Sequence, residues 1–81
     1  MEAMEAVKAA AGAAGIPLAG IGRSLGKRDN YVSAYVSNGR VPSCHVAAAM
    51  LAPCGYVLAA VPRDQLPAGA LVIDAPAPPR A

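Results

Sequence analysis

Residues 15–43 decide the fold, and they read GIPLAGIGRSLGKRDNYVSAYVSNGRVPS. The stretch contains two short segments with helical spacing of apolar residues, 17–25 before Gly26 and 29–37 after it. Proline suits the first position of a helix, and glycine commonly follows a helix end. The sequence therefore predicts two short helices joined by a turn, and Asn38-Gly39 ends the second one.

The segments on both sides of this pair are also predicted to be helical. Residues 2–14 are rich in alanine, the strongest helix former, and carry two glutamates in the first turn, where the helix dipole favours negative charge. Residues 43–51 begin with Ser43, a residue suited to capping a helix N-terminus. The predicted fold class is therefore mainly α, with four or five helices in a domain over residues 1–55.

The composition changes after residue 55. Residues 56–61 and 70–74 are rich in aliphatic and β-branched side chains, and the eight residues between them include two prolines and a glycine. This pattern predicts a C-terminal β-hairpin over residues 56–74. An isolated hairpin is marginal in water, so we expect it to pack on the helices or on a second copy. The proline-rich residues 75–81 predict a disordered tail.

Length and composition bound the class of protein. The chain has 81 residues, is 56% hydrophobic with many alanines, and contains neither Trp nor Phe. A chain of this size buries a little over ~60% of its unfolded surface, so a second copy would add stability, and we expect a homodimer. No apolar run reaches the ~18 residues that span a bilayer, and the N-terminus lacks the basic region of a secretory signal. We therefore expect a cytoplasmic protein with no membrane partner.

The charge is concentrated in the stretch that decides the fold. The whole chain carries +2, whereas residues 23–40 alone hold four cations and one acid, a net charge of +3. A localised basic patch is the electrostatic feature expected of a nucleic-acid-binding protein. An ordinary solvated surface is the other interpretation of the same charges, and only the fold distinguishes the two.

These features resemble the Cro and lambda-repressor-like (Xre-type) helix-turn-helix superfamily, over roughly residues 3–55. In such motifs the second helix, which is the third predicted helix of this chain, enters the major groove of DNA. The resemblance therefore implies a dimeric, sequence-specific transcriptional regulator of the phage-repressor type that binds double-stranded DNA with its third helix. The similarity runs through Gly15-Ile16, Ile21-Gly22, Leu25-Gly26, Val32, Tyr35, Asn38-Gly39-Arg40 and Pro42-Ser43.

The resemblance also implies which residues would contact DNA. Arginine pairs with guanine, and asparagine with adenine, through bidentate hydrogen bonds. The expected base contacts lie at and after the start of the third helix, and they are Arg28, Asp29, Asn30, Ser33 and Ala34. The expected phosphate contacts are Arg23, Lys27, Tyr31, Ser37, Asn38 and Arg40. Two alternatives stay open, because Asp29 also suits a helix cap and Tyr31 could instead cover the stem of its helix.

In Cro-like proteins the C-terminal strands mediate dimerisation, which assigns that role to the predicted hairpin. Its expected interface residues are Tyr56, Leu58, Ala60, Leu71, Val72 and Ile73. The sequence departs from the family pattern where Pro17-Leu18 replaces a common Ser or Thr followed by Gln, and where Val36 replaces a frequent Glu. An apolar Leu18 favours an alternative function, an antitoxin or protein-interaction module on the same fold, with a toxin as partner and weak or no DNA binding.

Other chemistry has little support in the sequence. Cys44, His45 and Cys54 are poorly spaced for zinc and lack a fourth ligand, so we predict no metal site. The two cysteines are interpreted as small apolar residues in a reducing compartment. Gly20 and Gly22 fall inside a predicted helix rather than after a strand, so they are not a dinucleotide-binding motif. We expect no cofactor and no catalysis.

Overall fold

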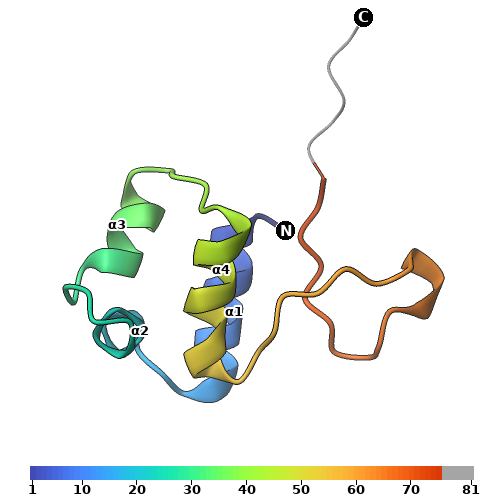
Figure 1. Cartoon of the computed structure of the whole chain (residues 1–81), viewed down its shortest axis with the longest axis horizontal. Helices are drawn as coiled ribbons and strands as arrows, with labels where there is room; N and C mark the ends of the chain where they lie inside the picture. Colours follow the sequence, from blue (N-terminus) through green and yellow to red (C-terminus); the bar gives the residue numbers. More distant parts are fainter. Residues whose placement is uncertain (76–81) are drawn as a thin grey trace, which may run out of the picture.

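The computed structural model describes residues 1–75. Within them the chain forms four α-helices and two short 3₁₀ turns (Figure 1). The mainly α fold class predicted from the sequence is therefore confirmed. None of the helices in this part of the chain combines the length and the apolar character needed to cross a membrane. The elements are α1 (Ala3–Ala14), α2 (Leu18–Ser24), α3 (Tyr31–Ser37), α4 (Cys44–Leu51), η1 (Ala52–Cys54) and η2 (Arg63–Gln65).

Two of the helices begin with side chains that satisfy free backbone N–H groups. The backbone N–H of Glu2 donates to the Glu5 carboxylate at 2.7 Å, as in a capping box. Ser43 Oγ accepts a hydrogen bond from the backbone N–H of Val46 at 3.2 Å, which caps α4 as predicted. The first and last helices therefore start where their local sequence indicates.

The helix ends share one backbone device. A glycine with positive φ follows α1, α2, α3 and the α4–η1 stretch, and the next residue donates its backbone N–H to the carbonyl five residues earlier. The residues after these glycines are Ile16, Lys27, Arg40 and Tyr56. Ile16 and Tyr56 pack half-buried against the core, whereas Lys27 and Arg40 are exposed. The two central helices thus end in cations whose backbone positions are fixed.

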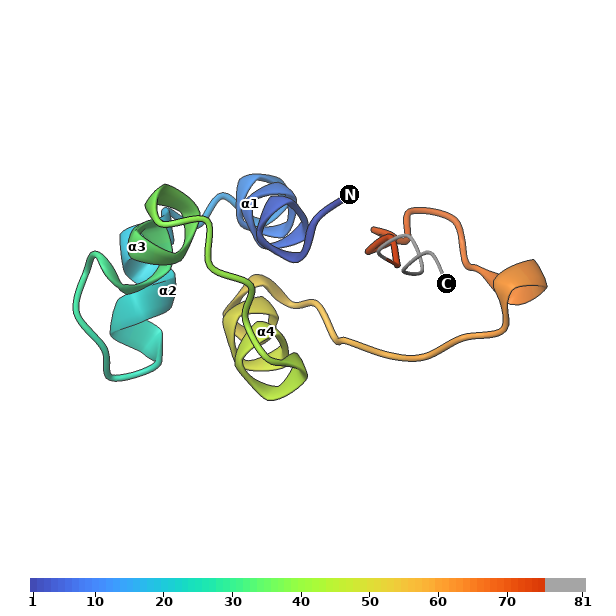
Figure 2. The same ribbon diagram turned by 90° about the horizontal axis from the view of Figure 1, so that it is seen from above.

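The core lies between two helix pairs, α1 packed on α4 and α2 packed on α3 (Figures 1 and 2). The four largest fully buried side chains are Val7, Ile21, Val32 and Met50, one from each helix. Burial of each side chain of this size stabilises the fold by roughly 1.5–3 kcal/mol. Val32 therefore places α3 in the same core cluster as the other three helices, with α2 as its main neighbour.

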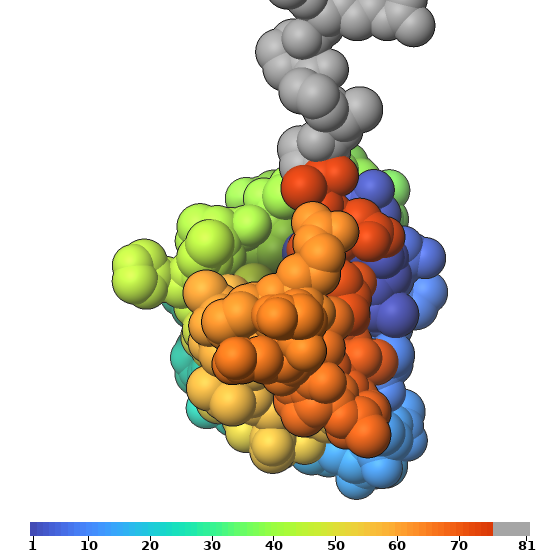
Figure 3. Space-filling model, turned by 90° about the vertical axis from the view of Figure 1, so that its right-hand side faces the viewer, coloured from blue at the N-terminus to red at the C-terminus, as the bar shows by residue number. Residues whose placement is uncertain are grey.

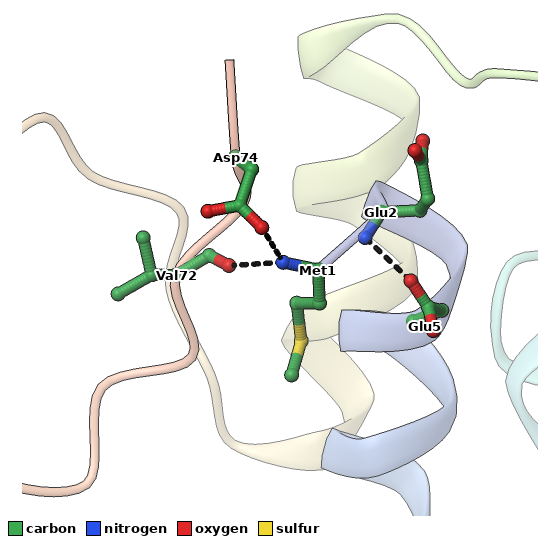
Figure 4. A network of polar contacts seen from close by, with 5 residues as sticks. All are labelled: Met1, Glu2, Glu5, Val72 and Asp74. Atoms are coloured by element: carbon green, nitrogen blue, oxygen red, sulfur yellow. Dashed lines mark hydrogen bonds and ion pairs between the residues drawn. The ribbon is translucent and has the colours of Figure 1, made fainter. Parts of the chain in front are cut away.

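The hairpin predicted over residues 56–74 is not formed. No strand occurs in residues 1–75, and residues 57–61 make no backbone hydrogen bond. The later segment meets the N-terminus instead, because the Met1 amine donates to the Val72 carbonyl at 3.1 Å and the Asp74 N–H donates to the Met1 carbonyl at 3.0 Å (Figure 4). The Asp74 carboxylate also forms an ion pair with the Met1 amine. The hairpin prediction failed because the second segment takes a different partner.

Residues 56–75, the C-terminal arm, lie on the side of α1 and α4 that faces away from α2 and α3 (Figures 1 and 2). The arm spreads over that face, and its last described residues lie against the start of α1 (Figure 3). The arm therefore leaves α3 uncovered. Of the tail predicted over 75–81, residues 76–81 lie outside the described residues.

Candidate nucleic-acid interface

Gly22 allows the turn between α2 and α3 to lie directly against α2. Gly22 is buried, and a Cβ placed on it would stand 2.5 Å from the Arg28 carbonyl oxygen and 3.5 Å from the Tyr31 Cβ. The same Arg28 carbonyl accepts the Tyr31 backbone N–H at 3.0 Å, at the first residue of α3. This close approach positions the start of α3.

The residues predicted to face DNA bases lie together at this start. Arg28, Asp29 and Asn30 are exposed, while Ser33 and Ala34, one turn further along α3, are half-buried. Ser33 Oγ donates to the Asn30 carbonyl at 3.2 Å. Arg28 makes no ion pair with any of the residues 1–75. Its guanidinium is therefore available for an external acceptor.

The alternative role of Asp29 as a helix cap is wrong. The N-cap position of α3 belongs to Asn30, whose side chain makes no capping hydrogen bond, and Asp29 lies one residue before it. The Asp29 carboxylate accepts instead from Arg23 Nη1 of α2 at 3.2 Å. Both side chains are largely exposed, and exposed ion pairs contribute only about 0–1 kcal/mol. The pair braces the turn weakly and partly neutralises Arg23.

Two further cations lie over the rings of the α3 tyrosines. Lys27 Nζ is 5.7 Å from the centroid of Tyr31, and Arg40 Cζ is 4.3 Å from the centroid of Tyr35. The two rings meet edge to face, with centroids 5.5 Å apart and an interplanar angle of 75°. A side-chain hydrogen bond with Tyr35 raises the pKa of Tyr31 above its ordinary value, and desolvation raises it further. Tyr31 is therefore a neutral hydroxyl at physiological pH.

The remaining predicted phosphate contacts, Ser37 and Asn38, are exposed at the C-terminal end of α3. The structure thus gathers the predicted residues around one helix, with cations at both ends and exposed polar groups at its start. The sequence analysis did not predict that Lys27 and Arg40 lie over the rings of Tyr31 and Tyr35. The signal was present in the Tyr31–Tyr35 spacing of one helical turn and in the Gly26-Lys27 and Gly39-Arg40 pairs.

The predicted dimerisation residues divide into two groups. Tyr56, Leu58 and Leu71 are half-buried against the core of their own chain, so they are engaged within the subunit. Ala60, Val72 and Ile73 are exposed. Sequence reasoning missed three other apolar side chains that the arm exposes, Val57, Val61 and Leu66. Alternate residues of an extended segment point to opposite sides, so Tyr56 and Leu58 lie against the core while Val57 between them is exposed.

The cysteines and the histidine do not come together. Cys44 and His45 are exposed at the start of α4, whereas Cys54 is buried. The Cys54 thiol donates to the Met50 carbonyl at 3.8 Å, and burial raises the pKa of that thiol. Among residues 1–75, no group of three His, Cys, Asp or Glu side chains could hold a metal ion.

Comparison of the chain with family models, with curated proteins and with solved structures gives no match.

Proposed function

We propose that this protein is a sequence-specific double-stranded DNA-binding transcriptional regulator of the Cro and lambda-repressor-like, helix-turn-helix type. The start of α3 would enter the major groove, with Arg28 and Asn30 contacting base edges. Lys27, Arg40 and Arg23 would contact phosphates and fix the register of the helix on the duplex. A cytoplasmic location follows from this function and is part of the proposal.

One observation carries the proposal. Arg28, in the turn before α3, and Asn30, at the N-cap of α3, are both exposed, and the helix is anchored in the core through Val32 and Tyr35. Arg28 has no ion-pair partner within residues 1–75, and the arm lies on the other side of the molecule. An exposed helix start that carries an unpaired arginine and an asparagine supplies the donors that recognise guanine and adenine.

We further propose that the protein binds DNA as a dimer that pairs through the C-terminal arm. The arm exposes several large apolar side chains, including Val57 at 83% and Val72 at 45% of their accessible surface. Its residues 57–61 leave their backbone groups without protein partners within the described chain. Unpaired extended backbone with apolar side chains is a template for pairing with another strand.

The same arm supports a second candidate function, an antitoxin or other protein-interaction module with weak or no DNA binding. Its exposed apolar side chains would then cover a protein partner such as a toxin. The earlier reason for this alternative has lost its weight, because Leu18 packs half-buried against the core. Purification from the native cell separates the two functions, since only the second requires a stoichiometric protein partner.

Selection from a random duplex pool tests the proposed DNA-binding function. We expect enrichment of palindromic sites, because a two-fold dimer mirrors its operator. Arg28→Ala should then cost about 1–3 kcal/mol at one base position of each half-site and leave the other positions unchanged. Lys8→Ala, an exposed cation on α1, is the matched control and should preserve the whole preference. A pool that shows no enrichment would contradict the proposal.

A further inference from the structure

Four side chains form a continuous row along one flank of α3, from Lys27 through Tyr31 and Tyr35 to Arg40. Each cation lies over one ring, at 5.7 and 4.3 Å from the centroids, and the rings touch each other edge to face. Tyr35 is 8% exposed and Tyr31 is half-buried, so the rings are anchored in the protein, while both cations are exposed. The row therefore presents two charges on a fixed aromatic base.

The backbone fixes the same two cations independently. Lys27 donates its N–H to the Gly22 carbonyl at 2.9 Å, and Arg40 donates its N–H to the Tyr35 carbonyl at 3.0 Å. Each bond closes a helix end that contains a glycine with positive φ, Gly26 after α2 and Gly39 after α3. At this position of the motif an apolar residue usually packs back on its helix, as Ile16 and Tyr56 do at the other two helix ends. At the end of α3, Arg40 over the ring of Tyr35 takes the place of that apolar contact, whereas Lys27, after α2, lies over the ring of Tyr31 in the next helix.

We propose that Tyr31 and Tyr35 are positioning residues that hold Lys27 and Arg40 as a preformed pair of phosphate-contacting charges at the two ends of α3. This inference rests on the proposed DNA-binding function and adds the residues that order its phosphate contacts. Free lysine and arginine side chains lose rotamer freedom when they bind, at a cost that preorganisation reduces. The rings restrict the two side chains before DNA arrives.

A neutral aromatic ring and a carboxylate differ in what they do to the charge of a bound cation. A cation attracted to the face of an aromatic ring keeps its full charge, whereas a carboxylate partner would neutralise it. The contrast lies within the same site, because Arg23 is paired with Asp29 at 3.2 Å while Lys27 and Arg40 have no acidic partner within residues 1–75. The aromatic row therefore orders two charges without reducing the positive potential near α3.

The experiment measures binding of the full chain to a fluorescein-labelled random-sequence duplex by anisotropy, as a function of salt. Tyr35→Leu and Tyr31→Leu remove the rings, whereas Tyr35→Phe and Tyr31→Phe keep the rings and remove only the hydroxyls. We expect each Leu variant to bind about two- to fivefold more weakly per subunit, and each Phe variant to bind like the wild type. The salt slope should stay unchanged in the Leu variants, because the charges remain, whereas Arg40→Gln should lower it by about 0.9 per subunit.

A readout without DNA accompanies the binding assay. The δ-methylene protons of Arg40 should show an upfield ring-current shift in the wild type and in Tyr35→Phe, and a loss of that shift in Tyr35→Leu. Circular dichroism checks that each variant is folded. If Tyr35→Leu is unfolded, the comparison of Tyr31→Leu with Tyr31→Phe provides the test, because Tyr31 is the less buried ring. Equal binding by the Leu and Phe variants, beside a wild type that binds, would overturn this inference alone. A wild type with no salt-sensitive binding would overturn the proposed function and this inference together.

Discussion

The Arg28 carbonyl oxygen lies so close to Gly22 that a Cβ on Gly22 would stand 2.5 Å from it. This contact joins α2 to the turn that leads into α3, since the same carbonyl accepts the Tyr31 backbone N–H. Neither partner of the contact can move freely, because one is helix backbone and the other is turn backbone. The position of the candidate DNA-reading residues therefore depends on the absence of a side chain at residue 22.

Gly22→Ala should destabilise the fold by about 1–3 kcal/mol, because an added methyl group overpacks a site with no flexible neighbour. Gly12→Ala in α1 is the matched control. Nothing lies within 4 Å of a Cβ at Gly12, so this change should stabilise the helix by up to ~1 kcal/mol. Urea unfolding followed by circular dichroism measures both. Equal effects of the two substitutions would show that the contact at Gly22 carries no strain.

Asp29→Asn should strengthen binding to non-specific duplex DNA. The substitution removes the ion pair with Arg23 at 3.2 Å and one negative charge near the phosphates. Arg23 then contacts its phosphate without competition from the Asp29 carboxylate, which should steepen the log-log salt slope by less than about 0.9 per subunit. Folding stability should change by less than ~1 kcal/mol, because both partners are exposed. Asp64→Asn, on the arm, should leave DNA binding unchanged, and an equal effect there would contradict the assignment.

The contact between Met1 and Asp74 should depend on pH. The side-chain hydrogen bond to Asp74 raises the pKa of the Met1 amine above its ordinary value of 8.0, which favours the protonated amine in the folded state. The contribution of the Met1–Asp74 ion pair to the stability of the folded state is therefore fully present below about pH 8 and is lost as the pH rises through the raised pKa. The amide chemical shift of Asp74, whose N–H is bonded to the Met1 carbonyl, should report the release of the arm as the pH rises above about 8. The same titration in Asp74→Asn should lose this transition, and an identical curve would contradict the account.

Exposed and core-facing residues of the arm should respond differently to a polar substitution. Leu71→Ser should lower the free energy of unfolding by about 1–2 kcal/mol, because Leu71 packs half-buried on the core. Val57→Ser and Val72→Ser should change it by less than ~0.5 kcal/mol, but together they should weaken self-association. Urea unfolding and sedimentation equilibrium separate the two effects. A double Val variant that self-associates like the wild type would remove the arm from the proposed dimer interface.

The helices could be predicted because their signals are local. Apolar spacing, a glycine after each helix end and Ser43 at the start of α4 together indicate four helices, and α3 differs from the prediction only in beginning at Tyr31. The hairpin could not be predicted correctly, because its pairing depends on which segment lies beside residues 72–74 in space. The sequence shows two extended segments but does not show that Met1 lies next to the second one.

The candidate site was predicted as a set of residues and not as a set of contacts. The basic segment and the exposed start of α3 follow from charge and periodicity. The pairing of Asp29 with Arg23 does not, because it joins residues six apart across a turn. The stacking of Arg40 on Tyr35 depends on the direction that Gly39 gives the chain after α3, and that direction is a property of the folded backbone.

The salt dependence of duplex binding tests the central claim most directly. If about four phosphates per subunit are neutralised around α3, the log-log slope of affinity against salt should be about −7 for a dimer. Lys27→Gln combined with Arg40→Gln should reduce the magnitude of that slope by about 4, whereas Arg63→Gln, a cation on the arm, should leave it unchanged. Binding that is insensitive to salt, or that weakens equally in the Arg63 variant, would contradict a DNA surface at α3.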